Sequence, residues 1–371
     1  MAAPSQSVEP LEPLEPLRSA SMADVLSQPA SMADVAPGDD RNRYMLFPIR
    51  YPRMWDMYKK QIAAFWTVEE VDLAQDHKDW AKLNDGERHF IEHVLAFFAG
   101  SDGIVNENLE LHFSKEVAVI PEASAFYGFQ RGVETIHANM YGVLIDAYIK
   151  DEAKKRRLFD GIRQVACVRQ KAEWALRWSG SDAPFLLRLV AFACVEGIHF
   201  SGSFCAVFWL KSRGLMPGLC FSNELISRDE ALHTEFAVEL YNTLTSADAM
   251  KEPQPRLEQA VVQRLVAEAV DIERTFVTDA LPVSLLGINA ASMVTYIEFV
   301  GDRLLALLGY DRLYGASNPF PFMNQCSLDV KTNFFERRAA EYCKAGVGDA
   351  EDAAAAASGG ELAIDTANAD F

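Results

Sequence analysis

Two short stretches, Glu134-Thr-Ile-His-Ala-Asn-Met-Tyr141 and Glu230-Ala-Leu-His233, share a Glu-x-x-His spacing. On an α-helix, residues three apart lie about 60° apart around the axis, and residues seven apart differ by about 20°. Glu134, His137 and Tyr141 are therefore expected on one stripe of a helix. Glu230 and His233 are expected on one stripe of another. A carboxylate and an imidazole so placed can bind one metal ion. Two such helices supply half of a dinuclear site in a helical bundle, and one acid from each of two further helices completes it.

Two isolated acids are candidates for the missing ligands. Asp102 lies inside a helical run, and Glu196 lies within the apolar run 184–210, where an unpaired carboxylate is strongly unfavourable. Four carboxylates and two histidines suit iron or manganese better than zinc. A third match, Glu196-Gly-Ile-His199, means that spacing alone does not select the two histidines. Because the template needs lone acids, we interpret Glu196 as a lone ligand and His199 as a packed histidine.

The sequence around these motifs predicts helices and few strands. Asn84 and Glu87 form a capping-box pattern that opens the first long helix. The expected helical runs cover residues 85–113, 123–149, 160–179, 184–212, 222–244, 256–277, 284–308 and 328–344. Small residues at Gly197 and Ser201-Gly-Ser203 predict a local π-type distortion beside Glu196. The fold class is therefore all-α, a helical bundle.

Composition separates a central domain from two tails. Residues 1–43 hold six of the sixteen prolines and repeat Ser-Met-Ala-Asp-Val, with no stretch able to bury an apolar face. We interpret 1–43 as a disordered tail. The helical domain is expected over 44–345. Residues 346–371 are mostly alanine, glycine and acid, which is typical of a flexible tail.

Charge and hydropathy exclude some functions. The net charge is −18 and no basic patch is present, which argues against nucleic acid binding. Residues 184–210 are long enough to span a bilayer, but Arg188, Glu196 and His199 are costly in lipid, so a buried core helix is expected. The cysteines form no Cys-x-x-Cys pair, as expected of reduced thiols in a cytoplasmic protein.

These residues resemble the small, radical-generating subunit of class I ribonucleotide reductase, in its eukaryotic-type branch. The resemblance covers roughly residues 44–345. It is carried by runs such as Phe97-Phe-Ala-Gly-Ser-Asp-Gly-Ile-Val-Asn-Glu-Asn108, Phe126-Tyr-Gly-Phe129, Val195-Glu-Gly197 and Ser222-Asn-Glu-Leu-Ile-Ser-Arg-Asp-Glu230. It implies a ferritin-like bundle with additional helices, a homodimer, and two iron ions, with manganese not excluded.

The resemblance also implies a role for each ligand position. One metal ion is held by Asp102, Glu134 and His137. The other is held by Glu196, Glu230 and His233, with Glu134 and Glu230 placed to bridge.

A second set of positions matches the family's radical chemistry. Tyr141 matches the tyrosine that is oxidised to a stable radical, and Phe200, Phe204 and Ile226 match the apolar wall around it. Asp229, Trp66 and Tyr342 match residues that carry the radical to the large subunit. Taken as isolated residues, Tyr141, Trp66 and the apolar three also suit an ordinary core, and Tyr342 an exposed aromatic.

The activity implied is that of a ribonucleoside-diphosphate reductase subunit. Oxygen is reduced at the metal pair, an externally supplied electron completes the balance, a tyrosyl radical forms, and the large subunit reduces ribonucleotides to deoxyribonucleotides. This chain has no phosphate-cradling glycine loop of its own. The C-terminal tail is expected to dock on the large subunit. Asp365 and Asn368 depart from the family's pattern there, which puts the docking strength in doubt.

Two other functions are compatible with a dinuclear helical site. One is a di-metal oxidase or oxygenase, which needs a substrate cavity beside Phe200, Phe204 and Ile226; bulky residues there argue against it. The other is a non-catalytic metal-storage or scaffold bundle. A degenerate scaffold is expected to have lost ligands, and all six are present.

Overall fold

The computed structural model describes residues 46–180, 182–280 and 288–326, and the regular elements within these ranges are all helices. The longer ones are α2 (Pro52–Ala63), α4 (Asp85–Asn108), α6 (Pro121–Tyr148), α9 (Ala166–Ser179), α10 (Phe185–Cys194), α11 (Ser201–Ser212), α12 (Pro217–Leu244), α13 (Gln259–Ala280) and α14 (Ala290–Leu307). Shorter pieces are η2 (Val68–Glu70), α3 (Asp76–Trp80), η3 (Leu109–Phe113), α5 (Ser114–Glu116), η4 (Val117–Val119), α7 (Glu152–Phe159), α8 (Gly161–Gln164), η5 (Val195–His199) and η6 (Pro321–Cys326). The all-α prediction is confirmed.

Helix ends agree with the sequence signals where a cap is present. The Asn84 side chain accepts a 2.9 Å hydrogen bond from the Glu87 amide, and the Glu87 carboxylate accepts one of 2.8 Å from the Asn84 amide. This confirms the predicted capping box. The predicted helix over 160–179 is instead two helices, because Val165 has an extended backbone (φ −116°, ψ 113°).

Three α-helices that precede or follow the predicted runs were missed, and some predictions fall outside the described residues. The sequence reasoning did not include α2, α3 or α7, although Pro52 at the first turn of α2 is a recognised start signal. The predicted helix over 328–344 and the tails 1–43 and 346–371 lie outside the described residues.

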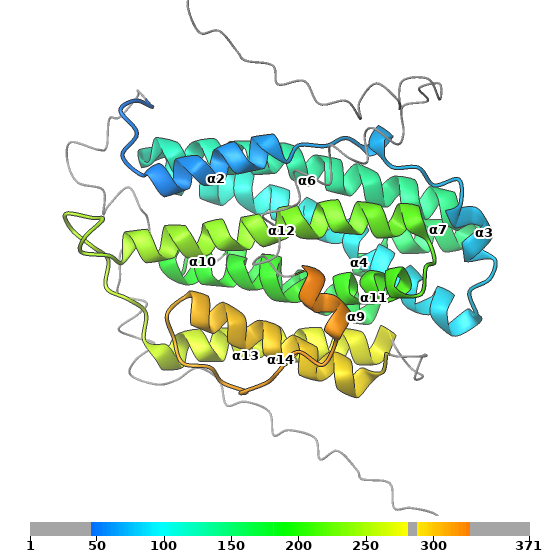
Figure 1. Ribbon diagram of the computed structural model, residues 1–371. Coiled ribbons are helices and arrows are strands. Elements are labelled where there is room, and N and C mark those ends of the chain that lie inside the picture. Colours follow the sequence, from blue (N-terminus) through cyan, green and yellow to red (C-terminus); the bar gives the residue numbers. More distant parts are fainter. Residues whose placement is uncertain (1–45, 181, 281–287, 327–371) are drawn as a thin grey trace, which may run out of the picture. The chain divides into compact units, whose positions relative to one another are not determined.

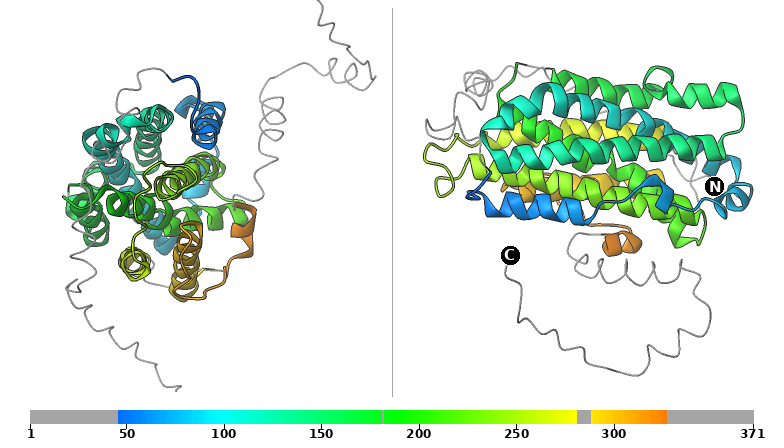
Figure 2. Two further views of the ribbon diagram at one scale, coloured as in Figure 1. Left: turned by 90° about the vertical axis from the view of Figure 1, so that its left-hand side faces the viewer. Right: turned by 90° about the horizontal axis from the view of Figure 1, so that it is seen from above.

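The helices that position the site pack side by side (Figures 1 and 2). Helix α6 packs against α4 on one side and α2 on another, and α12 contacts α6, α2, α10 and α11. Helices α13 and α14 pair with each other, and α13 also packs against α9 and α10. The interior between α4, α6, α12 and the α10–α11 run is therefore enclosed by helices.

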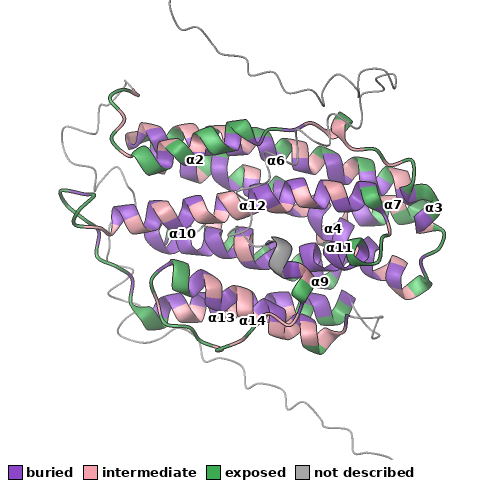
Figure 3. Cartoon of the chain, in the orientation of Figure 1, coloured by how far each residue is buried: buried purple, intermediate pink, exposed green. Residues whose placement is uncertain are grey.

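The run Phe185–Ser212 is the most apolar part of the described chain. It is long and apolar enough to cross a membrane, but 94% of its most apolar window is buried inside the protein. Figure 3 shows α10 and α11 buried in the midst of other helices. The run is therefore the core helix that its internal charges predicted.

A π segment, η5, interrupts this core helix between α10 and α11. The predicted distortion beside Glu196 is thus confirmed. Gly197 allows close packing on α12, because a Cβ there would lie 3.0 Å from Thr234 Cγ2. A second π segment, η3, extends α4 and was not foreseen.

Candidate metal centre

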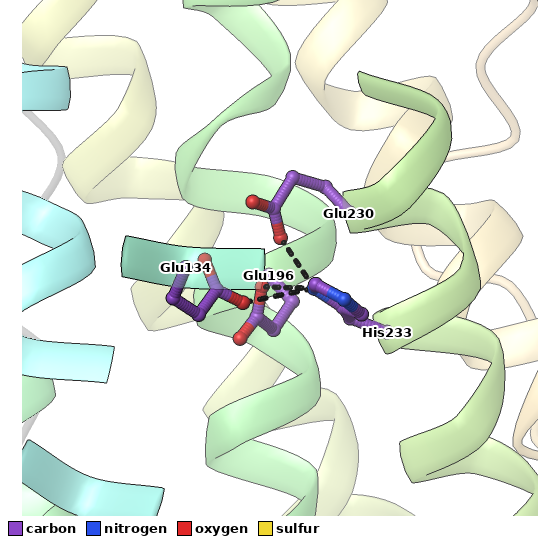
Figure 4. Close-up of side chains that lie close together, drawn as sticks. All are labelled: Glu134, Glu196, Glu230 and His233. Carbon is purple, nitrogen blue, oxygen red and sulfur yellow. Dashed lines mark hydrogen bonds and ion pairs between the residues drawn. The ribbon is translucent and has the colours of Figure 1, made fainter. Parts of the chain in front are cut away.

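The six predicted ligands come from four helical elements and meet in the interior. Asp102 lies on α4, Glu134 and His137 on α6, Glu196 on η5, and Glu230 and His233 on α12. None of the six is more than 2% exposed. Figure 4 shows Glu134, Glu196, Glu230 and His233 pointing toward one another.

Two carboxylates lie between the two imidazoles. Nδ1 of His137 lies 3.2 Å from Glu134 Oε2 and 3.0 Å from Glu230 Oε1. Nδ1 of His233 lies 2.9 Å from Glu134 Oε1 and 3.2 Å from Glu230 Oε2. Each of these two glutamates therefore faces both histidines, as a bridging carboxylate must.

The potential ligand atoms fall into two overlapping groups. Asp102, Glu134 and His137 form one group, and Glu134 joins Glu196, Glu230 and His233 in the other, with the atoms of each group within 4.8 Å of one another. A metal ion in each group would have Glu134 in common. This arrangement can hold two cations side by side.

Electrostatics favour added positive charge in this interior. Burial, reinforced by neighbouring carboxylates, raises the pKa of both Asp102 and Glu196 well above the ordinary values. Burial alone would lower the pKa of His233, but the charges of Glu134 and Glu230 and hydrogen bonds to them raise it to about 9. The cluster has an excess of acidic groups that only cations or protons can compensate.

Two buried carboxylate oxygens point to a missing partner. Asp102 Oδ2 and Glu196 Oε2 are buried and accept no hydrogen bond within the part of the chain that the structure describes. Buried polar atoms are almost always paired. A hard divalent cation is the partner that oxygen-rich donor sets accept. The residues present therefore fit a pair of metal ions.

Residues that sequence reasoning missed support these ligands. Gln130 Nε2 donates to Glu134 Oε1 at 3.0 Å and to Glu196 Oε1 at 3.2 Å. Ser101 Oγ donates to Asp102 Oδ1 at 3.2 Å. Gln130 lies four residues before Glu134, on the same helical stripe, so a signal for it was present in the sequence.

A chain of hydrogen bonds connects His137 to residues outside the predicted ligand set. Trp66 Nε1 donates to Asp229 Oδ2 at 2.8 Å, and the same oxygen lies 3.2 Å from His137 Nε2. Burial opposes ionisation of Asp229, but the adjacent Arg228 charge and hydrogen bonds from His137 and Trp66 lower its pKa. Arg228, which sequence reasoning also missed, donates to Asp229 Oδ1 at 2.8 Å.

Tyr141 lies in an aromatic pocket. It is 2% exposed, and its hydroxyl has no hydrogen-bond partner among the described residues. The ring of Phe98 stacks on it at 4.4 Å, and Phe200 and Phe204 pack on Phe98 at 5.9 and 5.4 Å. Burial, with the charge of nearby Asp102, raises the pKa of the phenol well above its usual value. Phe98 is a wall residue that the sequence interpretation did not include.

Of the remaining predicted positions, two are buried in the core and three lie outside the described residues. Ile226 is fully buried on α12. The imidazole of His199 belongs to neither group of ligand atoms and packs edge-on against Trp174 at 5.0 Å, as expected of a packed histidine. Tyr342, Asp365 and Asn368 lie outside the described residues.

Comparisons of sequence agree with the geometry. A family model for the small chain of ribonucleotide reductase matches residues 43–319. The ribonucleoside-diphosphate reductase small chain of Nicotiana tabacum is 59% identical over 306 residues, which cover 82% of this chain and 90% of the relative. The small chain of Trypanosoma brucei brucei is 57% identical over 313 residues, covering 84% and 90%.

Comparisons of structure give the same fold. The ribonucleotide reductase Rnr4 homodimer from Saccharomyces cerevisiae is similar with a TM-score of 0.66 and 36% identity, covering 81% of this chain and 90% of that chain. The dimanganese(II)-NrdF of Streptococcus sanguinis has a TM-score of 0.63 and 18% identity, covering 75% and 97%. At that identity the likeness concerns the fold alone.

Proposed function

The chain belongs to the ribonucleotide reductase small-chain family and is a small subunit of ribonucleoside-diphosphate reductase, and on this premise we propose that it forms and stores a radical on Tyr141 beside a two-metal site. Its fold is the ferritin-like helical bundle of that family. The observation that carries the proposal is the buried phenol of Tyr141, enclosed by aromatic rings, next to six converging side chains that could bind metal.

The proposed ligands divide between the two ions as the family pattern divides them. Asp102, Glu134 and His137 hold one ion. Glu196, Glu230 and His233 would hold the other, with Glu134 and Glu230 as the carboxylates that both ions would share. Support comes from the two overlapping groups of ligand atoms and from the buried oxygens of Asp102 and Glu196 that accept no hydrogen bond among the described residues. We propose iron, with manganese as the alternative, because both accept a donor set of four carboxylates and two imidazoles.

The chain's own residues then have distinct tasks. When bound, the metal pair supplies, with dioxygen, the oxidising power for one-electron oxidation of a phenol. Tyr141 would give one electron and its phenolic proton to the dioxygen that is reduced at the pair, and an external reductant would supply the further electron that completes the four-electron reduction. The rings of Phe98, Phe200 and Phe204, with Ile226, exclude water and external reductants from the site. Gln130 holds Glu134 and Glu196 in place through hydrogen bonds.

We propose that the radical is relayed through Asp229 and Trp66 toward a large subunit. The unbroken hydrogen bonds from His137 through Asp229 to Trp66 support the first part of this route. Tyr342 is proposed for the last part, and the tail 346–371 for docking. The large subunit then reduces ribonucleotides. A homodimer, a cytoplasmic location and the absence of a nucleic acid partner complete the proposal.

Electron paramagnetic resonance tests the central claim. Metal-free protein is loaded with ferrous iron without oxygen, exposed to oxygen, and compared with the Tyr141→Phe variant treated in the same way. We expect a tyrosyl signal in the parent protein and none in the variant, with equal iron content in both. Two bound irons without a radical in the parent protein, or an unchanged signal in the variant, would contradict the proposal. Manganese loading of the same samples compares the two metals.

A further inference from the structure

A buried ion pair lies beside the metal centre without belonging to it. Lys171 of α9 and Glu273 of α13 are 1% and 0% exposed, and Nζ lies 2.5 Å from Oε2. The ammonium also lies between two aromatic rings, 3.7 Å from the centroid of Phe97 and 3.5 Å from that of Phe276. Burying two charges is expensive.

The pair spans the break between η5 and α11. The end of one helix leaves carbonyl groups without partners, and the start of the next leaves amides. Lys171 Nζ donates to the backbone oxygen of His199, the last residue of η5, at 2.6 Å. Glu273 Oε1 accepts from the amide of Gly202, in the first turn of α11, at 2.9 Å. The cation thus lies at a helix C-terminus and the anion at a helix N-terminus, as the helix dipoles favour.

Helices α11 and α13 pack closely at Gly202. A Cβ on Gly202 would lie 2.6 Å from Glu273 Oε1 and 2.6 Å from Val277 Cγ1. Glycine therefore allows α13 to bring its carboxylate onto the backbone. The Ser201 hydroxyl binds the neighbouring carbonyl of Ile198 at 2.6 Å. The groups freed at Ile198, His199 and Gly202 thus all have partners, two of them from the ion pair.

We propose that Lys171 and Glu273 are positioning residues that hold the π segment in register and so aim Glu196 at the metal site; this rests on the proposed two-metal function. Glu196 lies on η5, three residues before His199, whose carbonyl accepts a hydrogen bond from Lys171. We call the Lys171–Glu273 pair, with its hydrogen bonds to His199 and Gly202, the clamp. Without the clamp, the freed carbonyl and amide can regain partners when the segment rewinds as a regular α-helix. Such rewinding shifts the helix by one residue, or about 100° of rotation. Glu196 would then leave the cluster.

The test replaces the pair while keeping the core filled. In the double variant Lys171→Met/Glu273→Leu both charges are lost together, a change that often leaves folding stability intact. The matched control is Arg188→Met/Glu116→Leu, a partly buried ion pair located at the start of the same core helix run. Gly202→Ala is an independent second variant, because its methyl group displaces Glu273. Each protein keeps the full chain, and thermal unfolding followed by circular dichroism checks folding.

Two readouts are measured. The first is Mn²⁺ binding, followed by electron paramagnetic resonance of the free ion. We expect two ions per chain in the parent and control proteins, and one of the two bound about tenfold or more weakly in the clamp variants. The second is amide hydrogen exchange of residues 198–204 in metal-free protein, where we expect a changed pattern of protected amides only in the clamp variants, because rewinding gives these amides different hydrogen-bond partners.

The outcomes separate this proposal from the proposed function. Unchanged Mn²⁺ binding and unchanged exchange in a folded double variant would overturn the clamp. So would equal weakening of both ions together with loss of the cooperative thermal transition, since that result means a general structural role. A parent protein that fails to bind two Mn²⁺ ions contradicts the metal site itself. The exchange comparison, made without metal, still decides for or against the clamp in that case.

Discussion

Oδ2 of Asp229 lies 2.8 Å from Nε1 of Trp66 and accepts its hydrogen bond. The same oxygen lies 3.2 Å from Nε2 of His137, whose Nδ1 faces Glu134 and Glu230. The indole also stacks on the imidazole, with ring centroids 6.0 Å apart. One carboxylate oxygen therefore connects a tryptophan outside the ligand set to a ligand of the proposed metal centre.

This connection predicts a separation of radical formation from turnover. In Trp66→Phe, the hydrogen bond to Asp229 is lost while His137 keeps its own. We expect the Tyr141 signal to form normally and ribonucleotide reduction with the large subunit to fall to background. Losing a hydrogen bond to a charged group should also lower the free energy of unfolding by about 2 kcal/mol. Resonance spectra, turnover assays and denaturant unfolding measure the three effects. Normal turnover in this variant would exclude Trp66 from the route.

Gln130 predicts a stability effect that depends on metal. Its amide donates to Glu134 and Glu196, so Gln130→Met leaves two buried carboxylates without that donor. We expect the metal-free variant to be about 2 kcal/mol less stable than the metal-free parent protein. Bound cations partly compensate the same carboxylates, so the difference should shrink when Mn²⁺ is added. Urea unfolding with and without the ion tests this. An equal difference in both states would assign Gln130 a packing role only.

The ring of Phe98 should control the lifetime of the radical. In Phe98→Leu, the planar surface that stacks on Tyr141 is replaced by a smaller side chain. The cavity should lower stability by ~1–3 kcal/mol, as core truncations do. It should also admit water or reductants to the phenol. We expect the initial radical signal to be comparable to that of the parent protein and its decay to be faster. Electron paramagnetic resonance spectra recorded at intervals after oxygen exposure measure this decay. Decay at the parent rate would mean that Phe200, Phe204 and Ile226 protect Tyr141 without Phe98.

A histidine remote from the metal site predicts a pH effect on stability. Burial lowers the pKa of His93 on α4 below its ordinary value of 6.5. The unfolded chain therefore takes up a proton at higher pH than the folded one. The stability linked to His93 is present above pH 6.5 and is lost as the pH falls from 6.5 to the folded pKa. In the His93→Gln variant, the decrease in stability that comes from protonation of His93 at low pH should disappear.

The comparison needs a matched surface histidine. The exposed residue His77 supplies it as His77→Gln. Unfolding of metal-free protein is measured at pH 7.5 and at pH 5.5 for the parent and both variants. We expect a smaller decrease in stability for His93→Gln than for the parent protein or the control. Identical decreases for all three proteins would show that His93 is as accessible to protons when folded as when unfolded.

Much of the fold follows from local patterns. The capping box at Asn84 and Glu87 marked the start of α4 because it depends only on residues three apart. The stripe of Glu134, His137 and Tyr141 follows from helical periodicity in the same way. The charges inside the run Phe185–Ser212 correctly predicted a buried core helix. The missed α2 and α7 are helices whose start signals were present but unused.

Side-chain contacts between different helices could not be predicted from these local patterns. The sequence by itself determined most of the long helices, the pairing of Glu134 with His137 and of Glu230 with His233, and the π distortion, since each depends on neighbours along one chain segment. Only the tertiary structure decided that Gln130 reaches Glu196, that Phe98 covers Tyr141, and that Lys171 and Glu273 meet at the break after His199. Such contacts depend on the distance and rotation between packed helices. A one-residue change of register turns a side chain by about 100°, so helical periodicity within each segment cannot specify them.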